Sequence, residues 1–103
     1  MIKIKYKVDN DIIKNITMTG HAMYNVFGKD IVCASVSSLV IYSINLCISF
    51  DSQSIIYKND NGIVIEHIND DNITQKILKT MIISLKELAD DYPKNITIRK
   101  EEI

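Results

Sequence analysis

Alternating apolar and polar positions at the start of the chain predict a β-hairpin. One face of residues 1–8 carries only apolar side chains, namely Ile2, Ile4, Tyr6 and Val8. Lysines occupy the other face, which is the pattern of a half-buried strand. Asp9-Asn10-Asp11 predicts a turn. Residues 12–19 are expected to return as a second strand. Its predicted buried face consists of Ile12, Ile16 and Met18.

Two longer segments are typical of helices. Residues 31–50 are apolar on most faces, so we expect a central helix that begins near Asp30, a good N-cap. Serine and asparagine residues interrupt this run, which favours a buried helix over a membrane span. A second helix, capped at residues 70–72, repeats apolar residues at intervals of three and four. Pro93 is expected to end it.

Three short strands complete the predicted fold. They cover residues 54–57, 63–68 and 96–99. The segment Asn59-Asp60-Asn61-Gly62 predicts a hairpin between the first two strands, because Asn-Gly tolerates the positive φ angles of a type I′ turn. The element order is then ββαββαβ. We expect a single α+β domain over residues 1–103, with two helices packed on one face of a mixed sheet.

Composition narrows the possible classes of protein. Apolar residues make up 47% of the chain and charged residues 24%, which predicts a folded globular domain. The formal net charge is −1 and no run of basic residues occurs, so we expect no direct binding of nucleic acid. The N-terminal segment lacks a small-residue cleavage site and is not predicted to be a signal peptide. We therefore expect a cytoplasmic protein that does not associate with membranes.

The two cysteines differ in their predicted surroundings. Cys33 and Cys47 lie about 21 Å apart along one predicted helix, whereas a disulfide needs Cα atoms within about 7 Å. Two free thiols are expected, which also favours the cytoplasm. If Asp30 is the N-cap, Cys33 lies in the first turn, where unpaired N–H groups and the helix dipole favour a thiolate. The alternative is a buried, inert cysteine, and this interpretation suits Cys47.

His21 makes a catalytic pair possible. It follows Gly20 at the end of a predicted strand, and the loop up to residue 29 can fold back to place its imidazole against Cys33. A thiol beside an imidazole is an activated nucleophile with its general base. His67 has no cysteine near it in sequence and is interpreted as structural. The Cys and His spacings match no standard zinc pattern, so no metal or other cofactor is predicted.

Asp30 and Ser37 are further candidates with two interpretations each. Asp30 either caps the helix or orients His21. Ser37 lies one helical turn after Cys33, where it either contacts substrate or bonds back to its own helix. For an acyl transfer at Cys33, backbone N–H groups near the helix start are expected to stabilise the oxyanion. The loop of residues 20–28 is expected to close over the substrate.

Two motifs together resemble the ribosomal-processing cysteine protease family Prp. The chain reads Gly20-His21-Ala22, then Tyr24, and then Gly-Lys-Asp-Ile-Val-Cys-Ala-Ser-Val-Ser over residues 28–37. The family shows Gly-His-Ala, a short Gly-bounded loop and Asp-Ile-Val-Cys-Ala-Ala-Val-Ser. The order of hairpins and helices and the Tyr-Pro before the last strand also fit. Ser35 replaces an alanine of the family pattern, and both residues are small.

The resemblance implies a catalytic dyad of His21 and Cys33, with Gly20, Asp30 and Ser37 as supporting or substrate-binding residues. It also implies a substrate, the N-terminal extension of the bacterial large-subunit ribosomal protein numbered twenty-seven, and a homodimer. An alternative is a non-catalytic module that binds the ribosome or a ribosomal protein. A thiol redox protein is a third hypothesis, but we expect no resolving cysteine within reach of Cys33.

Overall fold

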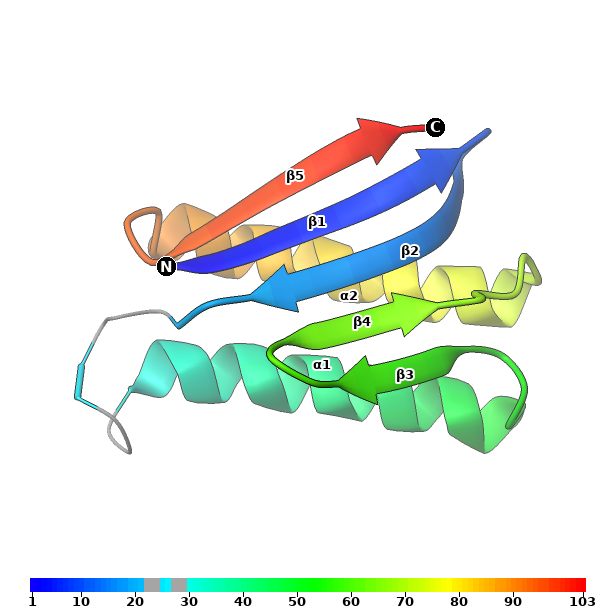
Figure 1. The fold of residues 1–103 in the computed structure, drawn as a ribbon, viewed down its shortest axis with the longest axis horizontal. Helices are drawn as coiled ribbons and strands as arrows, with labels where there is room; N and C mark the ends of the chain where they lie inside the picture. The colour runs from blue at the N-terminus through cyan, green and yellow to red at the C-terminus, as the bar shows by residue number, and fades with distance from the viewer. Residues whose placement is uncertain (22–24, 27–29) are drawn as a thin grey trace.

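The computed structural model describes residues 1–21, 25–26 and 30–103, and these form two layers (Figure 1). One layer is a five-stranded sheet in the order β3-β4-β2-β1-β5. Its strands are β1 (Ile2–Asp9), β2 (Ile12–Thr19), β3 (Ile56–Asn59), β4 (Ile63–Glu66) and β5 (Ile96–Glu102). The sheet is mixed, because β1 pairs with β2 antiparallel and with β5 parallel.

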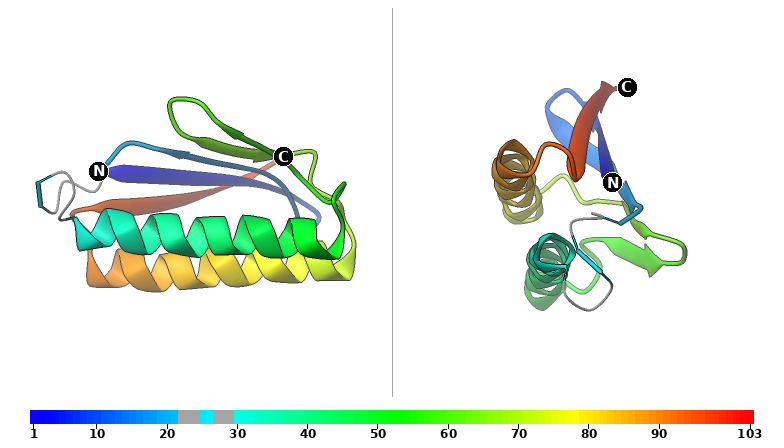
Figure 2. Two further views of the ribbon diagram at one scale, coloured as in Figure 1. Left: turned by 90° about the horizontal axis from the view of Figure 1, so that it is seen from below. Right: turned by 90° about the vertical axis from the view of Figure 1, so that its left-hand side faces the viewer.

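The second layer consists of α1 (Ile31–Phe50) and α2 (Asn72–Asp91). Both helices lie on the same face of the sheet and leave the other face open (Figure 2). The predicted fold class and the element order ββαββαβ are therefore confirmed. The core lies between the layers, where the apolar face of β1 meets the buried stripes of the two helices.

The turn between β1 and β2 corrects the predicted face of β2. Asn10 and Asp11 have φ angles of +48° and +65°, which suits a two-residue hairpin turn. Past this turn the register shifts between Lys7 and Val8, so Lys14 has no partner on β1. Such a bulge reverses the alternation of side chains. As a result Ile13 is buried near the turn, whereas Ile12 was predicted there.

The bounds of the short strands also differ from those predicted. β3 begins at residue 56, because Ser54 is held at the end of α1 by a hydrogen bond from its Oγ to the Cys47 carbonyl. β4 ends at Glu66, since His67 has a φ of +49°. The predicted hairpin between them is present, and its loop holds three residues, numbers 60–62. β5 runs to residue 102 because it pairs with residues 2–8 of β1.

The prediction that α1 is central in the fold is wrong. It lies beside α2 on the surface of the sheet, so only one stripe of its residues is buried (Figure 2). The stripe consists of Val32, Val36, Val40, Ser43, Ile44 and Cys47. Several apolar side chains of α1 are exposed, namely Ile31, Ile41, Tyr42, Ile48 and Phe50. By length and composition alone this helix could also cross a membrane, but its buried stripe packs on the sheet.

Candidate active site

The first turn of α1 is fixed by Asp30. One carboxylate oxygen, Oδ1, accepts hydrogen bonds from the backbone N–H groups of Val32 at 3.0 Å and Cys33 at 2.9 Å. The backbone carbonyl of Asp30 accepts from the amide of Ala34 at 3.1 Å. Asp30 is therefore the N-cap of α1, as predicted, and Cys33 lies in the first helical turn.

These bonds limit which amides at the start of α1 could stabilise an oxyanion. The amides at the start of α1 were expected to stabilise it, but those of residues 32–34 donate to Asp30 in this structure. An oxyanion donor must point at the reacting oxygen without a competing acceptor. While Asp30 caps the helix, these three amides are not available to an oxyanion.

Gly20 shapes the entry to His21. It has a φ of +88°, and a Cβ at this position would collide with the backbone carbonyl of Met1. Only glycine fits such a conformation without strain. The chain can therefore pass close to the start of β1 as it leaves β2, and His21 follows with its side chain exposed.

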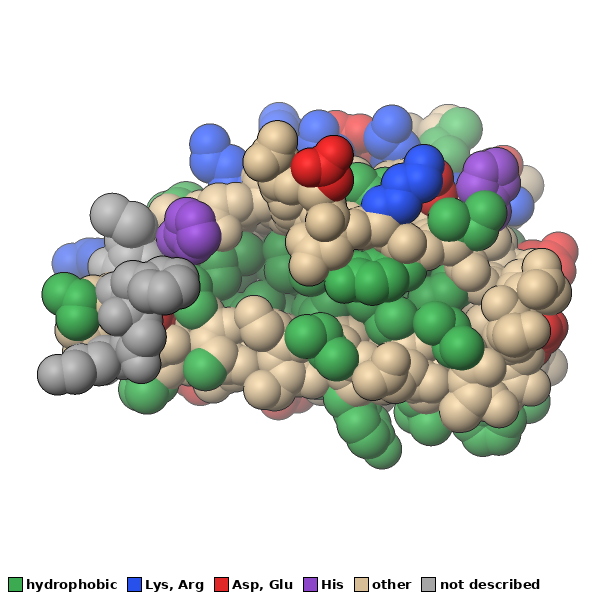
Figure 3. Space-filling model, turned by 60° about the horizontal axis from the view of Figure 1, so that its bottom comes forward, with side chains coloured by type: hydrophobic (Ala, Val, Ile, Leu, Met, Phe, Trp, Pro, Cys, Tyr) green, Lys and Arg blue, Asp and Glu red, His purple; other side chains and the backbone are tan. Residues whose placement is uncertain are grey.

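All five residues predicted for the site line one cavity. It has a volume of about 660 Å³ and lies between α1 and the ends of β2 and β4. The predicted residues that line it are Gly20, His21, Asp30, Cys33 and Ser37. In the space-filling view, hydrophobic side chains form the floor of the hollow between α1 and the β3–β4 hairpin (Figure 3).

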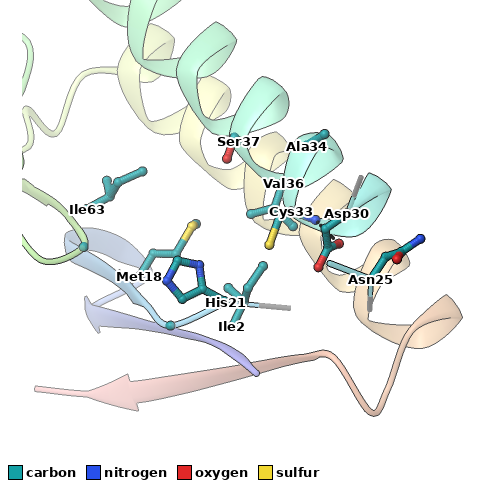
Figure 4. Close-up of a pocket in the computed structure, with 12 residues that line it drawn as sticks. Ile2, Met18, His21, Asn25, Asp30, Cys33, Ala34, Val36, Ser37 and Ile63 are labelled. Carbon is teal, nitrogen blue, oxygen red and sulfur yellow. Dashed lines mark hydrogen bonds between the residues drawn. The ribbon is translucent and has the colours of Figure 1, made fainter. Parts of the chain in front are cut away.

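The two proposed catalytic side chains enter the cavity from different elements. His21 comes from the chain after β2 and Cys33 from α1, and both project into the space between these elements (Figure 4). Cys33 packs partly against the core, so its thiol is supported on one side and reachable from the other. Ser37 lies one turn further along α1. This arrangement places a thiol and an imidazole on the walls of one cavity.

The sequence did not indicate the rest of the cavity wall. The additional residues are Ile2, Met18, Asn25, Ala34, Val36, Gly62 and Ile63. Ile63 pairs with Met18 in the sheet, which brings the β3–β4 hairpin to the site. Gly62 has a φ of +131°, and a Cβ there would lie 2.6 Å from the carbonyl oxygen of Met18. Only the sheet register reveals this contact, because nothing local in the sequence links residues 18 and 62.

The other cysteine and histidine do not line this cavity. Cys47 is buried in the core, and burial together with the negative charge of Asp71 raises the pKa of its thiol to about 11. His67 is exposed after β4. Neither cysteine forms a disulfide bond. Among the described residues, no group of three or more Cys, His, Asp or Glu side chains is arranged to hold a metal ion.

Part of the predicted loop cannot be compared with the structure. Residues 22–24 and 27–29, which include Tyr24 and Gly28 of the motif, lie outside the described residues. The expectation that this loop closes over the substrate therefore stays a prediction.

Comparisons with known proteins agree with the resemblance in the motifs. The family described as cysteine protease Prp matches residues 1–97. The ribosomal processing cysteine protease Prp of Staphylococcus aureus is 33% identical over 94 residues, which cover 87% of this chain and 89% of the relative. The Mycoplasma pneumoniae protein of the same name is 32% identical over 93 residues, covering 84% and 90%.

A solved structure extends this similarity to the fold. The crystal structure of an essential ribosomal processing protease Prp from S. aureus, in complex with a covalently linked product peptide, superposes with a TM-score of 0.92. It is 29% identical, and the match covers 98% of this chain and 100% of that one. A catalytic protein is thereby favoured over a non-catalytic binding module. The chain belongs to the cysteine protease Prp family of ribosomal processing proteases.

Proposed function

We propose that this protein removes the short N-terminal extension of the large-subunit ribosomal protein numbered twenty-seven, with Cys33 as nucleophile and His21 as general base. The observation that carries the proposal is the meeting of these two side chains in one cavity of a cysteine protease fold. The S. aureus relative was crystallised with a substrate peptide and with a covalently linked product peptide. Covalent attachment is what a cysteine nucleophile forms during peptide cleavage.

The proposed reaction is acyl transfer in two stages. His21 takes the proton of the Cys33 thiol, and the thiolate attacks the carbonyl carbon of the scissile peptide bond. The carbon–nitrogen bond then breaks as His21 returns the proton to the leaving amine. A thioester remains on Cys33. Water attacks this thioester while His21 accepts the water proton. The carbon–sulfur bond then breaks, and His21 returns the proton to the sulfur to restore the free thiol.

The other predicted residues have supporting roles in this proposal. Asp30 holds the backbone of Cys33 through the bond at 2.9 Å and places a carboxylate near the dyad. Ser37 lines the cavity next to the thiol, where its hydroxyl can contact the substrate backbone. Gly20 lets the chain carry His21 to the cavity.

The chain offers a matched control for each member of the dyad. Cys33→Ala should abolish cleavage of a peptide that spans the extension, whereas Cys47→Ala removes a cysteine that does not line the cavity and should retain it. His21→Ala should slow cleavage by about 10² to 10⁴-fold, the usual contribution of a general base. His67→Ala removes another exposed imidazole and should leave the cleavage rate unchanged. A peptide with the same residues in scrambled order tests the sequence preference.

Circular dichroism should show that all four variants remain folded. Undiminished cleavage by folded Cys33→Ala would overturn the assignment of the nucleophile. Equal cleavage of the scrambled peptide would overturn the proposed substrate while leaving the dyad in place.

We also propose a homodimer in the cytoplasm. Exposed apolar side chains of α1 and β3 offer surface that a second copy would bury, among them Ile41, Tyr42 and Ile56. Sedimentation equilibrium should give twice the chain mass, and Ile41→Glu with Tyr42→Glu should shift the protein to monomer. A monomer at all concentrations would contradict the dimer.

A further inference from the structure

Positive side chains gather on the open face of the sheet, opposite the helices. Lys3, Lys5 and Lys7 occupy the exposed positions of β1, which lies between β2 and β5 in the sheet. Arg99 of β5 is paired with Lys5 in the parallel register, so its exposed side chain joins the same row. We call these four residues the basic face. Figure 1 looks onto this side of the sheet, and Lys and Arg side chains follow the upper edge of Figure 3.

The neighbours of the basic face are hydrogen-bonding side chains. On β2 the residues opposite the three lysines are Thr19, Thr17 and Asn15, and on β5 Thr97 is paired with Lys3. On the open face of β1, β2 and β5, the acidic side chains lie away from the start of β1. Asp9 is the last residue of β1, and Glu101 approaches Lys5 at 3.4 Å. Positive charge is therefore concentrated toward the start of β1.

That start is also the catalytic end of the molecule. Ile2, which precedes Lys3, lines the cavity that holds Cys33. Side chains alternate along a strand, so Ile2 points to the helix side and Lys3 to the open side. A ligand on the basic face would thus lie next to the site without covering it.

The composition of this face favours a nucleic-acid backbone over a protein or a lipid surface. Within β1, β2 and β5, which are fully described, no aromatic residue points to the open side, since Tyr6 is buried toward the helices. The aromatic anchors of protein interfaces and the stacking platforms for single strands are therefore lacking in these strands. Lys, Arg, Thr and Asn are the side chains that contact phosphate and sugar groups. Such interfaces are polar and positively charged.

We propose that the basic face binds the phosphate backbone of double-stranded RNA, without sequence specificity, beside the catalytic end of the molecule. RNA duplexes are recognised mainly through phosphates and 2′-hydroxyls, which suits a surface of cations and hydroxyls. Binding of nucleic acid was not predicted from the sequence, because apolar residues separate the lysines of β1 and no run of basic residues occurs. The sheet brings them together with Arg99 from the other end of the chain. This inference does not depend on which peptide is cleaved.

Fluorescence anisotropy with a labelled RNA duplex of about 16 base pairs tests the proposal. Four phosphate contacts predict that log K falls with log salt with a slope of about −3.6. The triple variant Lys3→Gln, Lys7→Gln, Arg99→Gln should bind at least about tenfold more weakly and reduce the slope to about −1. The control triple variant Lys76→Gln, Lys79→Gln, Lys86→Gln loses the same charge from α2 and should bind within about twofold of the unchanged protein.

Several results would overturn the inference. These are no binding at low salt, equal weakening in the two triple variants, and preferred binding to single-stranded RNA or to anionic phosphatidylserine vesicles. Comparable binding of a DNA duplex would support the phosphate contact, since both duplexes present it. Peptide cleavage without RNA should be unchanged in the basic-face variant. Loss of RNA binding and loss of the proposed peptidase activity are therefore separate outcomes.

Discussion

The carboxylate of Asp30 accepts a hydrogen bond from the backbone N–H of Cys33 at 2.9 Å, so one residue both caps α1 and holds the proposed nucleophile. The same residue lines the cavity together with Cys33 and His21, so it brings a negative charge to the site as well as a cap. Capping and charge are therefore two separate contributions of Asp30 to the site. Substitutions that separate the two effects show which one dominates.

Replacing Asp30 by alanine removes both the cap and the charge. We expect Asp30→Ala to lose about 1 kcal/mol of unfolding free energy, the usual cost of a lost N-cap, and to cleave peptide more slowly because Cys33 is no longer held. Asp71→Ala removes the N-cap of α2 and should lose similar stability. Its cleavage rate per folded molecule should not change. Urea unfolding and peptide kinetics on both variants provide the comparison.

Asp30→Asn distinguishes the cap from the charge. Asparagine is as good an N-cap as aspartate, so this variant should keep its stability and most of its activity. If Asp30→Asn were as slow as Asp30→Ala while remaining as stable as the unchanged protein, the charge would be the important property. The dependence of both rates on pH would then show whether His21 is the group affected.

The local features of the fold could be predicted from the sequence because each has a local cause. Alternation in β1, the N-caps Asp30 and Asp71 and the end of α2 before Pro93 all follow from neighbouring residues. The bulge in β2 could not be predicted, since it depends on pairing with β1. The surface position of α1 was missed for a similar reason, because its apolar residues fill a buried stripe and an exposed face alike.

Some parts of the candidate site could be predicted from the sequence, and others could not. The positions of His21 and Cys33 near each other were inferred from a short loop and a helix start. The wall formed by Gly62 and Ile63 comes from a hairpin distant in sequence, and only the pairing of Ile63 with Met18 brings it there. Long-range register is decided by the whole sheet, which single-sequence patterns do not encode.

The two thiols should differ in reactivity. Burial raises the pKa of the Cys47 thiol from 9.0 to about 11, and the side chain is not accessible in the folded protein. At about pH 8 iodoacetamide should therefore modify one thiol in the native protein and two after denaturation. Mass spectrometry counts the adducts. The Cys33→Ala variant should show none before denaturation and one after it, and rapid native labelling of Cys47 would contradict the buried position.

Acid should weaken the contribution of Asp71 to stability. The hydrogen bond from the Thr74 backbone N–H lowers the pKa of the Asp71 carboxyl below its ordinary value of 3.8, and the Thr74 hydroxyl adds to this effect. A lowered pKa in the folded state gives stability that is complete above pH 3.8 and lost as the pH falls through the folded-state value. Below that value the contribution disappears.

Asp71→Asn keeps the cap and removes this titration. Urea unfolding at about pH 6 should show the unchanged protein to be more stable than Asp71→Asn, and the difference should shrink at about pH 3. Asp90→Asn, at the other end of α2, changes the net charge equally without removing a cap. If the difference in unfolding free energy between the unchanged protein and Asp71→Asn stayed the same at both pH values, this would contradict a stabilising role of ionised Asp71.

Gly62 should matter for cleavage because it lets the β3–β4 hairpin approach the end of β2. With a φ of +131° and a Cβ position 2.6 Å from the Met18 carbonyl oxygen, Gly62→Ala cannot be accommodated unless the loop moves. We expect a loss of more than about 1 kcal/mol in unfolding free energy. Because Ile63 and Met18 both line the cavity, the displaced wall should also raise KM for the peptide more than it lowers kcat.

Two variants separate this effect from a general loss of stability. Asn61→Gly changes the neighbouring residue, whose φ of +54° glycine adopts freely, and should leave both KM and stability nearly unchanged. Asp71→Ala lowers stability by a comparable amount far from the cavity and should leave KM alone. If Gly62→Ala lost stability as expected but cleaved with an unchanged KM, the hairpin would support the fold without shaping the peptide site. A raised KM in Gly62→Ala alone would place the hairpin in the peptide-binding wall.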